Sequence, residues 1–105
     1  MAEIRWSLTS EADLREIEEY IARDSVVYAV RMVDRIVESV DRLEPFPLSG
    51  RMVPEFERTE LREVICRPYR IVYLYNEPVV TILRVVHGAR DIIRLADEDP
   101  WDTVE

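Results

Sequence analysis

Residues 67–90 of the chain read RPYRIVYLYNEPVVTILRVVHGAR. Two runs rich in β-branched and aromatic residues, at positions 69–75 and 79–86, flank the turn signal Asn76-Glu77-Pro78. This pattern predicts two strands joined by a tight turn. The hairpin would bring four basic side chains into one region, namely Arg70, Arg84, His87 and Arg90. Arginine and histidine bind phosphate or carboxylate, and histidine can also transfer protons near neutral pH.

Side-chain alternation limits how these basic residues can cooperate. On the second strand Leu83, Val85 and His87 share one face, and Arg84 lies on the opposite face. Without a bulge, Arg84 and His87 therefore point to different sides of the sheet. A site that uses both side chains would need the chain to turn at His87-Gly88.

The sequence before the hairpin predicts a strand and two helices. Residues 3–8 alternate between polar and apolar, as in a half-buried strand. Residues 12–23 carry apolar side chains three and four positions apart, which predicts an amphipathic helix. Thr9 or Ser10 could be its N-cap, and Ser10 with Asp13 resembles a capping box. Asp24-Ser25 breaks and recaps the chain, and a second amphipathic helix with an apolar stripe extends to residue 43.

The remaining segments complete the predicted architecture. Residues 44–50 form a proline-rich loop, residues 51–59 an irregular stretch and residues 60–66 a strand. Residues 90–95 fit either one helical turn or a short strand. The element order is therefore β-α-α-β-β-β. It predicts an α+β fold in which an N-terminal strand and an antiparallel helical hairpin pack on a mostly antiparallel sheet.

Length and composition indicate one water-soluble domain. The 105 residues are enough for a core without disulfides. We expect a single domain over residues 1–96, followed by an acidic tail at 97–105 in which Trp101 could be an anchor. No apolar run approaches the roughly 20 residues that span a bilayer, and the N-terminus lacks signal-peptide features, so we expect a cytoplasmic protein. Cys66, the lone cysteine, is expected to be a buried thiol. The sequence suggests no metal site and no cofactor.

The charge pattern restricts both partners and chemistry. The net charge is −8, and all fourteen basic residues are arginine. A guanidinium cannot act as a neutral base, so any proton transfer would need His87, a carboxylate, a tyrosine or Cys66. The overall charge disfavours binding to nucleic acid. Residues 44–96, with seven acidic residues and eight arginines, are the one segment where anion binding is plausible.

Six motifs in this order resemble the ParE/RelE superfamily of small bacterial toxins, over about residues 4–95. They comprise a tryptophan-serine pair, a helix motif, a Pro-Leu-Ser-Gly loop and three strand motifs. These are Trp6-Ser7; Ala12-Asp13-Leu14 with Ile17 and Tyr20-Ile21; Pro47-Leu48-Ser49-Gly50-Arg51-Met52-Val53-Pro54-Glu55; Arg62-Glu63-Val64; Tyr69-Arg70-Ile71-Val72-Tyr73; and Val85-Val86-His87-Gly88-Ala89-Arg90.

The resemblance implies a growth-arresting toxin encoded beside an antitoxin, as in plasmid stabilization modules. Relatives of the ParE type block DNA gyrase, whereas relatives of the RelE type cut mRNA on the ribosome. Arg70 and Arg90 match arginines that the ribonuclease branch uses on the scissile phosphate. A ribonuclease could here use Arg70, His87 and Arg90 with Glu63 or Glu55 as base. However, this chain has no lysine and no tyrosine after Arg90, and the ribonuclease branch uses both.

These departures favour a ParE-like toxin that binds DNA gyrase without being an enzyme. Its binding surface for antitoxin or target would comprise Arg62, Arg70, Tyr73, Arg84 and Arg90. The expected partner is a ParD-like antitoxin that folds on binding, with operator DNA contacted only through that antitoxin. The alternatives are a ribosome-dependent mRNA interferase and a degenerate member that binds antitoxin without being toxic.

Three of the candidate residues also have structural interpretations. Arg70 could pair with Glu63 across neighbouring strands. His87 could satisfy a backbone group at the end of its strand. Gly88 could be required by the backbone at a bend. For each residue, the structural and the functional interpretation predict different contacts.

Overall fold

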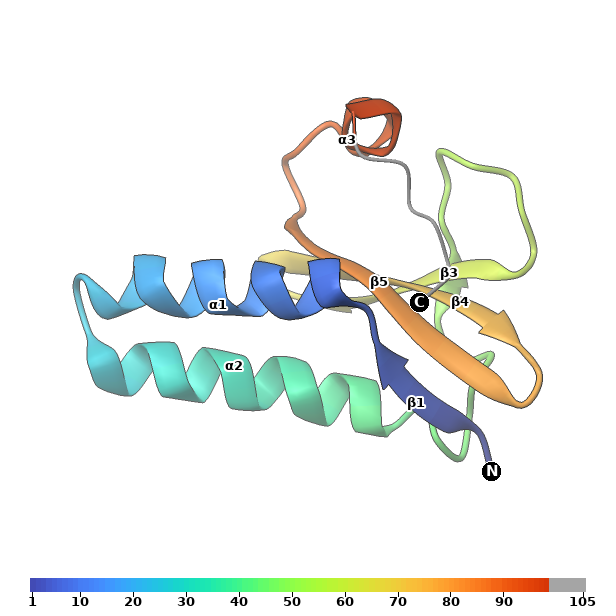
Figure 1. Cartoon of the computed structure of the whole chain (residues 1–105), viewed down its shortest axis with the longest axis horizontal. Coiled ribbons are helices and arrows are strands. Elements are labelled where there is room, and N and C mark those ends of the chain that lie inside the picture. Colours follow the sequence, from blue (N-terminus) through green and yellow to red (C-terminus); the bar gives the residue numbers. More distant parts are fainter. Residues whose placement is uncertain (99–105) are drawn as a thin grey trace.

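The computed structural model describes residues 1–98 and has two helices packed beside a five-stranded sheet (Figure 1). The elements follow the predicted order, with the short strand β2 added and with helix α3 in the segment that fitted either a helical turn or a strand. The bounds are β1 Glu3–Trp6, α1 Leu8–Ala22, α2 Val26–Asp41, β2 Arg51–Met52, β3 Leu61–Cys66, β4 Tyr69–Asn76, β5 Val79–His87 and α3 Ile92–Glu98.

The predicted hairpin forms the centre of the sheet. The strand order is β1-β5-β4-β3-β2, with β1 parallel to β5 and the other neighbours antiparallel. The peptide bonds before Pro68 and Pro78 are cis, in the turns at either end of β4. The α+β prediction with a mostly antiparallel sheet is therefore confirmed.

The first helix begins earlier than the sequence predicted. Ser7, rather than Thr9 or Ser10, is the N-cap, and its Oγ accepts a hydrogen bond from the Ser10 amide at 3.0 Å. The Ser7 hydroxyl also donates to the Leu83 carbonyl oxygen, so the cap is fixed by β5 as well as by the helix. Asp13 is not a capping-box partner, because its carboxylate is bound to β5. Ser25 caps α2, as predicted.

A bulge in β5 changes the predicted alternation. Val72 pairs with Arg84 and Tyr73 pairs with Ile82, so Leu83 has no counterpart on β4. Val85 packs in the core beneath the helices, whereas Leu83 packs in a second core on the other face. The prediction that Leu83 and Val85 share a face was wrong because the extra residue reverses the alternation at that point.

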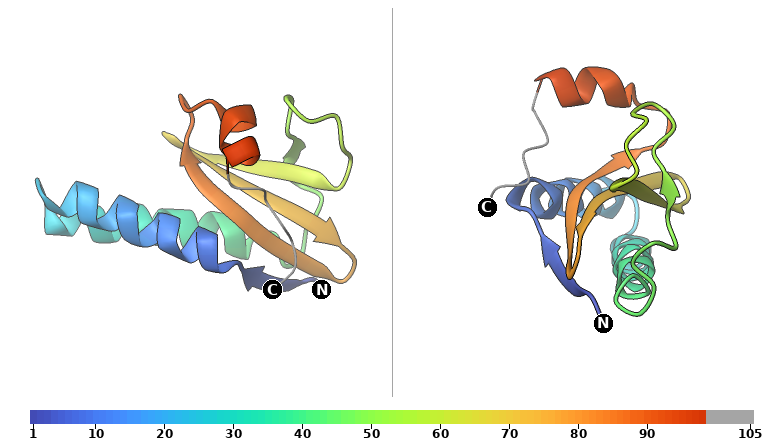
Figure 2. Two further views of the ribbon diagram at one scale, coloured as in Figure 1. Left: turned by 45° about the horizontal axis from the view of Figure 1, so that its top comes forward. Right: turned by 90° about the vertical axis from the view of Figure 1, so that its right-hand side faces the viewer.

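Both faces of the sheet are covered, but by different elements (Figure 2). Helices α1 and α2 cover one face over a core that includes Met32, Ile36 and Ile82. The segment between β2 and β3 lies against the other face with α3, over a smaller core that includes Val53, Val72 and Ile92. The sheet face that carries Arg70 is therefore largely covered in the described residues.

The described residues end within the predicted acidic tail. Helix α3 resolves the ambiguity at 90–95 in favour of a helix, and it includes Asp97 and Glu98. The rest of the predicted tail, with Trp101, lies outside the described residues. Within residues 1–98, no helix is both long and apolar enough to cross a lipid bilayer.

Tyr73 joins the sheet to the loop that follows α2. Its side chain is fully buried; its hydroxyl donates to the Pro47 carbonyl at 2.7 Å and accepts from the Gly50 amide at 3.1 Å. Burial raises the pKa of this phenol, which stays protonated at neutral pH. Gly50 allows the close approach, because a Cβ there would lie 2.6 Å from the Tyr73 hydroxyl oxygen and from the Glu63 carbonyl oxygen.

Replacing Tyr73 with phenylalanine should therefore lower the free energy of unfolding by about 1 to 3 kcal/mol, the cost of burying polar groups without partners. Urea denaturation followed by circular dichroism measures it. Tyr75→Phe is the matched control, because Tyr75 is only partly buried and should lose less than about 0.5 kcal/mol. Equal losses in the two variants would contradict this role of the Tyr73 hydroxyl.

Candidate functional site

Arg70 is the centre of a buried ionic cluster. Its Nε donates to Glu63 Oε1 at 2.6 Å, and its two terminal nitrogens donate to both carboxylate oxygens of Glu55, at 3.0 and 2.8 Å. Glu63 lies two residues from the position directly opposite Arg70 on β3, so this is a diagonal cross-strand pair. The predicted pairing of Arg70 with Glu63 is confirmed, and Glu55 is an additional partner.

Glu63 connects this cluster to β2. Its side chain has no exposed surface, and its second oxygen accepts from Arg51 Nε at 2.6 Å. The side chain of Arg70 is only 10% exposed, whereas that of Arg51 is 59% exposed. The hydrogen bonds from Arg70 to Glu55, together with the one to Glu63, raise the pKa of Arg70 despite its burial. The guanidinium therefore remains charged and occupied by carboxylates.

The Glu55 carboxylate should make stability dependent on acid pH. Hydrogen bonding from Arg70 lowers the pKa of Glu55 below its ordinary value of 4.5, partly opposed by burial. Because the folded-state pKa is the lower one, the stabilisation is complete above about pH 4.5 and is lost as the pH falls through the folded value. Between about pH 6 and about pH 3, the urea midpoint should therefore fall less in Glu55→Gln than in the wild type.

Glu57→Gln is the control for this measurement, because Glu57 is an exposed neighbour on the same loop. Its urea midpoint should keep the pH dependence of the wild type. If the Glu55→Gln midpoint falls as steeply as that of the wild type, the ion pair with Arg70 does not contribute to acid sensitivity.

Arg84 belongs to a separate ion pair with the first helix. Its Nε and one terminal nitrogen donate to the two oxygens of Asp13, at 2.9 and 3.2 Å, and both side chains are about nine-tenths buried. Asp13 also accepts from the Val85 amide at 2.9 Å. Strand β1 ends at Trp6, opposite Ile82, so Asp13 supplies an acceptor where β5 has lost its strand partner.

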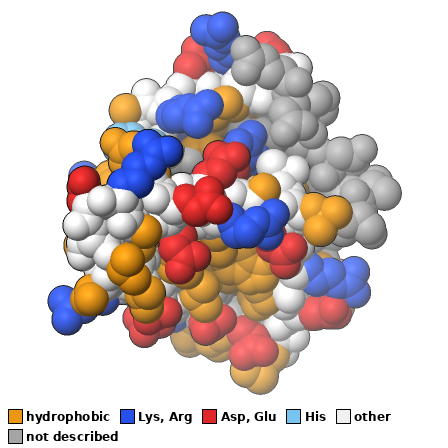
Figure 3. Space-filling view, turned by 60° about the vertical axis from the view of Figure 1, so that its left-hand side comes forward, with side chains coloured by type: hydrophobic (Ala, Val, Ile, Leu, Met, Phe, Trp, Pro, Cys, Tyr) orange, Lys and Arg blue, Asp and Glu red, His pale blue; other side chains and the backbone are white. Residues whose placement is uncertain are grey.

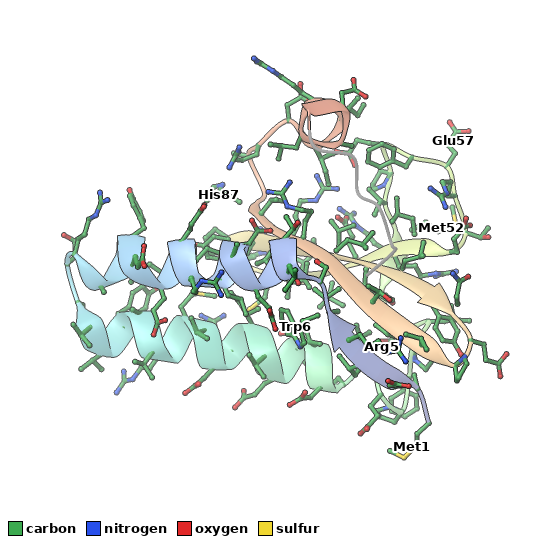
Figure 4. The ribbon with its side chains drawn as sticks, viewed as in Figure 1. Met1, Arg5, Trp6, Met52, Glu57 and His87 are labelled. Carbon is green, nitrogen blue, oxygen red and sulfur yellow. The ribbon has the colours of Figure 1, made fainter. Side chains whose placement is uncertain are left out.

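His87 lies at the C-terminal end of β5, beside α1 (Figure 4), and both His87 and Arg90 are exposed. The Nδ1 atom of His87 accepts from the Ala89 amide at 3.1 Å, which confirms that this histidine satisfies a backbone group. Its ring also makes an edge contact with Tyr69 at 5.9 Å between centroids. His87 and Arg90 line a groove of about 400 Å³ beside α1.

The structure divides the residues proposed for a ribonuclease. Arg70 and Glu63 lie together in the buried cluster, whereas His87 and Arg90 line the groove beside α1. That groove contains neither Arg70 nor Glu63. Gly88 lies next to Arg70, and its amide donates to the Pro68 carbonyl; a Cβ at Gly88 would lie 3.3 Å from that oxygen.

The residues proposed for antitoxin or target binding also have structural partners. Arg62 donates to the Thr59 and Gly50 carbonyls, each at 3.0 Å. Tyr73, Arg70 and Arg84 are buried. Of the five proposed residues, only Arg90 is an exposed side chain. The His87 side of the surface mixes acidic, basic and apolar side chains (Figure 3).

A basic surface that the sequence pattern did not indicate lies beside the outer edge of β3. Arg35 of α2, its C-cap residue Arg42 and Arg67 after β3 line one groove of about 530 Å³ with Ile65. In the sequence these arginines look like the solvated faces of a helix and a turn. Only the packing of α2 against β3 shows that they converge. In the described residues, no cluster of histidine, cysteine or acidic side chains is arranged to hold a metal ion.

Comparison with known proteins agrees with the fold and its order of motifs. Residues 4–92 match the family described as the ParE toxin of type II toxin-antitoxin system, parDE. Toxin RelE2 of Caulobacter vibrioides is 36% identical over 91 residues, which covers 86% of this chain and 99% of that protein.

Two solved structures have the same fold. The chromosomal ParDE TA system from P. aeruginosa superposes with a TM-score of 0.70 at 24% identity, over 83% of this chain and 96% of that one. The toxin–antitoxin complex RelBE2 from Mycobacterium tuberculosis has a TM-score of 0.62 at 24% identity, over 85% and 93%. The family match and the 36% identity to a toxin that is covered over almost its whole length establish the family of this protein. The chain belongs to the ParE toxin family of type II toxin–antitoxin systems, within the RelE/ParE superfamily.

Proposed function

We propose that this chain inhibits bacterial growth by binding DNA gyrase, that it catalyses no reaction, and that a ParD-like antitoxin neutralises it. The observation that carries the proposal is the closed set of bonds around Arg70. A ribonuclease needs a cation that is free to stabilise charge on the phosphoryl group and a carboxylate that can reach the 2′-hydroxyl. Here Arg70 is bound to two carboxylates, and Glu63 is buried between two arginines.

The partner follows from the family. Two similar structures are described as a ParDE system and a RelBE2 toxin–antitoxin complex, which supports a cognate antitoxin for this chain. We expect that antitoxin to fold on binding and to make the contacts with operator DNA, because the net charge of −8 on this chain opposes approach to phosphates. We expect the toxin to act in the cytoplasm without a cofactor, as one domain over residues 1–96.

A ribosome-dependent mRNA interferase is the second candidate, and one observation favours it. His87 and Arg90 are exposed and line the same groove, so a proton donor and a cation are available together. An enzyme that acts at this groove would use neither Arg70 nor Glu63, because both side chains are bonded to each other in the buried cluster.

Two assays with the purified toxin separate these functions. We expect inhibition of gyrase-catalysed DNA supercoiling, its relief by the cognate antitoxin, and intact mRNA in a coupled translation assay. Unimpaired supercoiling together with mRNA cut at ribosomes would refute the gyrase proposal. His87→Ala should leave growth inhibition unchanged, and a loss of toxicity in this variant would favour the interferase. Induction without antitoxin that causes no growth arrest would indicate a non-toxic antitoxin-binding member.

A further inference from the structure

The outer edge of β3 is only partly covered by another strand. Strand β2 pairs with Arg62 and Glu63 and with no later residue of β3. The Leu61 carbonyl accepts from the Val53 amide on this outer side, and backbone direction alternates along a strand. The Ile65 amide and carbonyl therefore also point outward, where no strand of residues 1–98 pairs with them. Ile65 is 42% exposed at the same place.

Arginine side chains surround this open edge. The groove of about 530 Å³ along α2 meets a second groove of about 430 Å³, and both contain Ile65 and Arg42. Arg35, Arg42 and Arg67 are exposed and make no ion pair with any described residue, and Glu38 is the one acidic residue that lines the first groove. Within residues 1–98, an acidic protein thus places three arginines that have no ion pair beside backbone groups that have no strand partner.

We propose that the β3 edge at Ile65 binds an extended acidic segment of the antitoxin, which adds a strand to the sheet while its carboxylates contact Arg35, Arg42 and Arg67. The identity of the partner rests on the proposed function. An added strand satisfies the outward amide and carbonyl, and alternate side chains of the segment would pack on Ile65. The arginines would favour an acidic partner and fix its register.

The same features argue against nucleic acid as the occupant. A phosphate backbone offers no donors to the Ile65 carbonyl, and it gains little from an exposed isoleucine. Long-range repulsion from a chain of net charge −8 also opposes polyanions more strongly than a short acidic segment. The surface is therefore assigned to a peptide.

Hydrogen exchange on the unmodified toxin tests the strand addition directly. The probe is the antitoxin encoded beside this chain, purified and added in excess. The Ile65 amide should exchange rapidly in the free toxin and become protected by at least about tenfold in the complex. An Ile65 amide that stays unprotected in a saturated complex would overturn the proposal, while antitoxin binding itself would leave the proposed partner intact.

Variants test the backbone and the arginines separately. Ile65→Pro removes an amide that β4 does not use, and proline is accepted on an edge strand where the N–H faces outward; Ile65→Val is its control. Ile65→Pro should weaken antitoxin binding by about tenfold or more, and Ile65→Val by less than about twofold. The triple variant Arg35→Gln, Arg42→Gln, Arg67→Gln should weaken it by about tenfold to a hundredfold. Arg31→Gln, an exposed arginine of the same helix outside the grooves, should have no effect.

Three results decide between the occupants. Weaker binding by the triple variant at low salt, with a smaller difference at high salt, supports an acidic segment on this edge. Wild-type affinity in both Ile65→Pro and the triple variant overturns the proposal without affecting the existence of the antitoxin. Labelled RNA or DNA that binds through the three arginines, with antitoxin affinity unchanged, also overturns it. If the purified antitoxin does not bind the toxin at all, this result contradicts the proposed function itself and not only the proposed binding site.

Discussion

Replacing Asp13 with alanine should lower the free energy of unfolding by about 3 to 5 kcal/mol, the usual cost of removing one partner from a buried ion pair. The carboxylate accepts two hydrogen bonds from Arg84 and one from the Val85 amide. Its loss leaves the Arg84 guanidinium buried without this counter-charge and the Val85 amide without its acceptor. Because Asp13 lies on α1 and the other two on β5, the variant should also loosen the helix from the sheet.

Urea denaturation measures the loss, and hydrogen exchange at the Val85 amide shows where it arises. Asp34→Ala is the matched control, since Asp34 is an exposed acidic residue of α2, and its effect should stay within about 0.5 kcal/mol. Asp13→Asn keeps an oxygen acceptor and should lose less than Asp13→Ala. A loss in Asp13→Ala no larger than in Asp34→Ala would show that the ion pair is not important for stability.

Asp13 shows why local sequence patterns predicted the helices and strands better than they predicted the tertiary contacts between them. The helices and the central hairpin have clear periodicity, and their positions were predicted to within a few residues. The start of α1 was not, because Ser7, Thr9 and Ser10 are all residue types that cap helices well. The choice depends on β5, where the Ser7 hydroxyl binds the Leu83 carbonyl 76 residues away. Strand β2 was missed for a similar reason, since two residues without periodicity pair there with β3.

The candidate site was predictable only as far as its residues are neighbours in one hairpin. The diagonal pair of Arg70 with Glu63 follows from strand pairing, and the sequence suggested it. Glu55 reaches Arg70 from a loop whose course is set by Val53 and Phe56 in the second core, which no local pattern encodes. The bulge at Leu83 likewise has no signal in an unbroken apolar strand. The arginines beside β3 are visible only after α2 is packed on the sheet.

Replacing Arg70 with methionine should destabilise the toxin by about 3 to 5 kcal/mol, because Glu63 would stay buried with only the partly exposed Arg51 as its partner. A structural role and a role in target binding make different predictions for this variant. If Arg70 only contacted a target, its loss would reduce toxicity while the urea midpoint stayed the same. The bonds to Glu63 and Glu55 instead predict that stability falls first.

A second variant separates the charge from the packing. The double variant Glu63→Leu, Arg70→Met removes both buried charges and keeps apolar volume, so it should recover most of the stability lost by Arg70→Met alone. Recovered stability with retained inhibition of gyrase would establish that Arg70 and Glu63 serve the architecture of the toxin. Recovered stability with lost inhibition would show that inhibition requires the side chain of Arg70 or Glu63 itself. A double variant as unstable as Arg70→Met would contradict the energetic argument, because burying an unpaired carboxylate would then not be the cause of the loss.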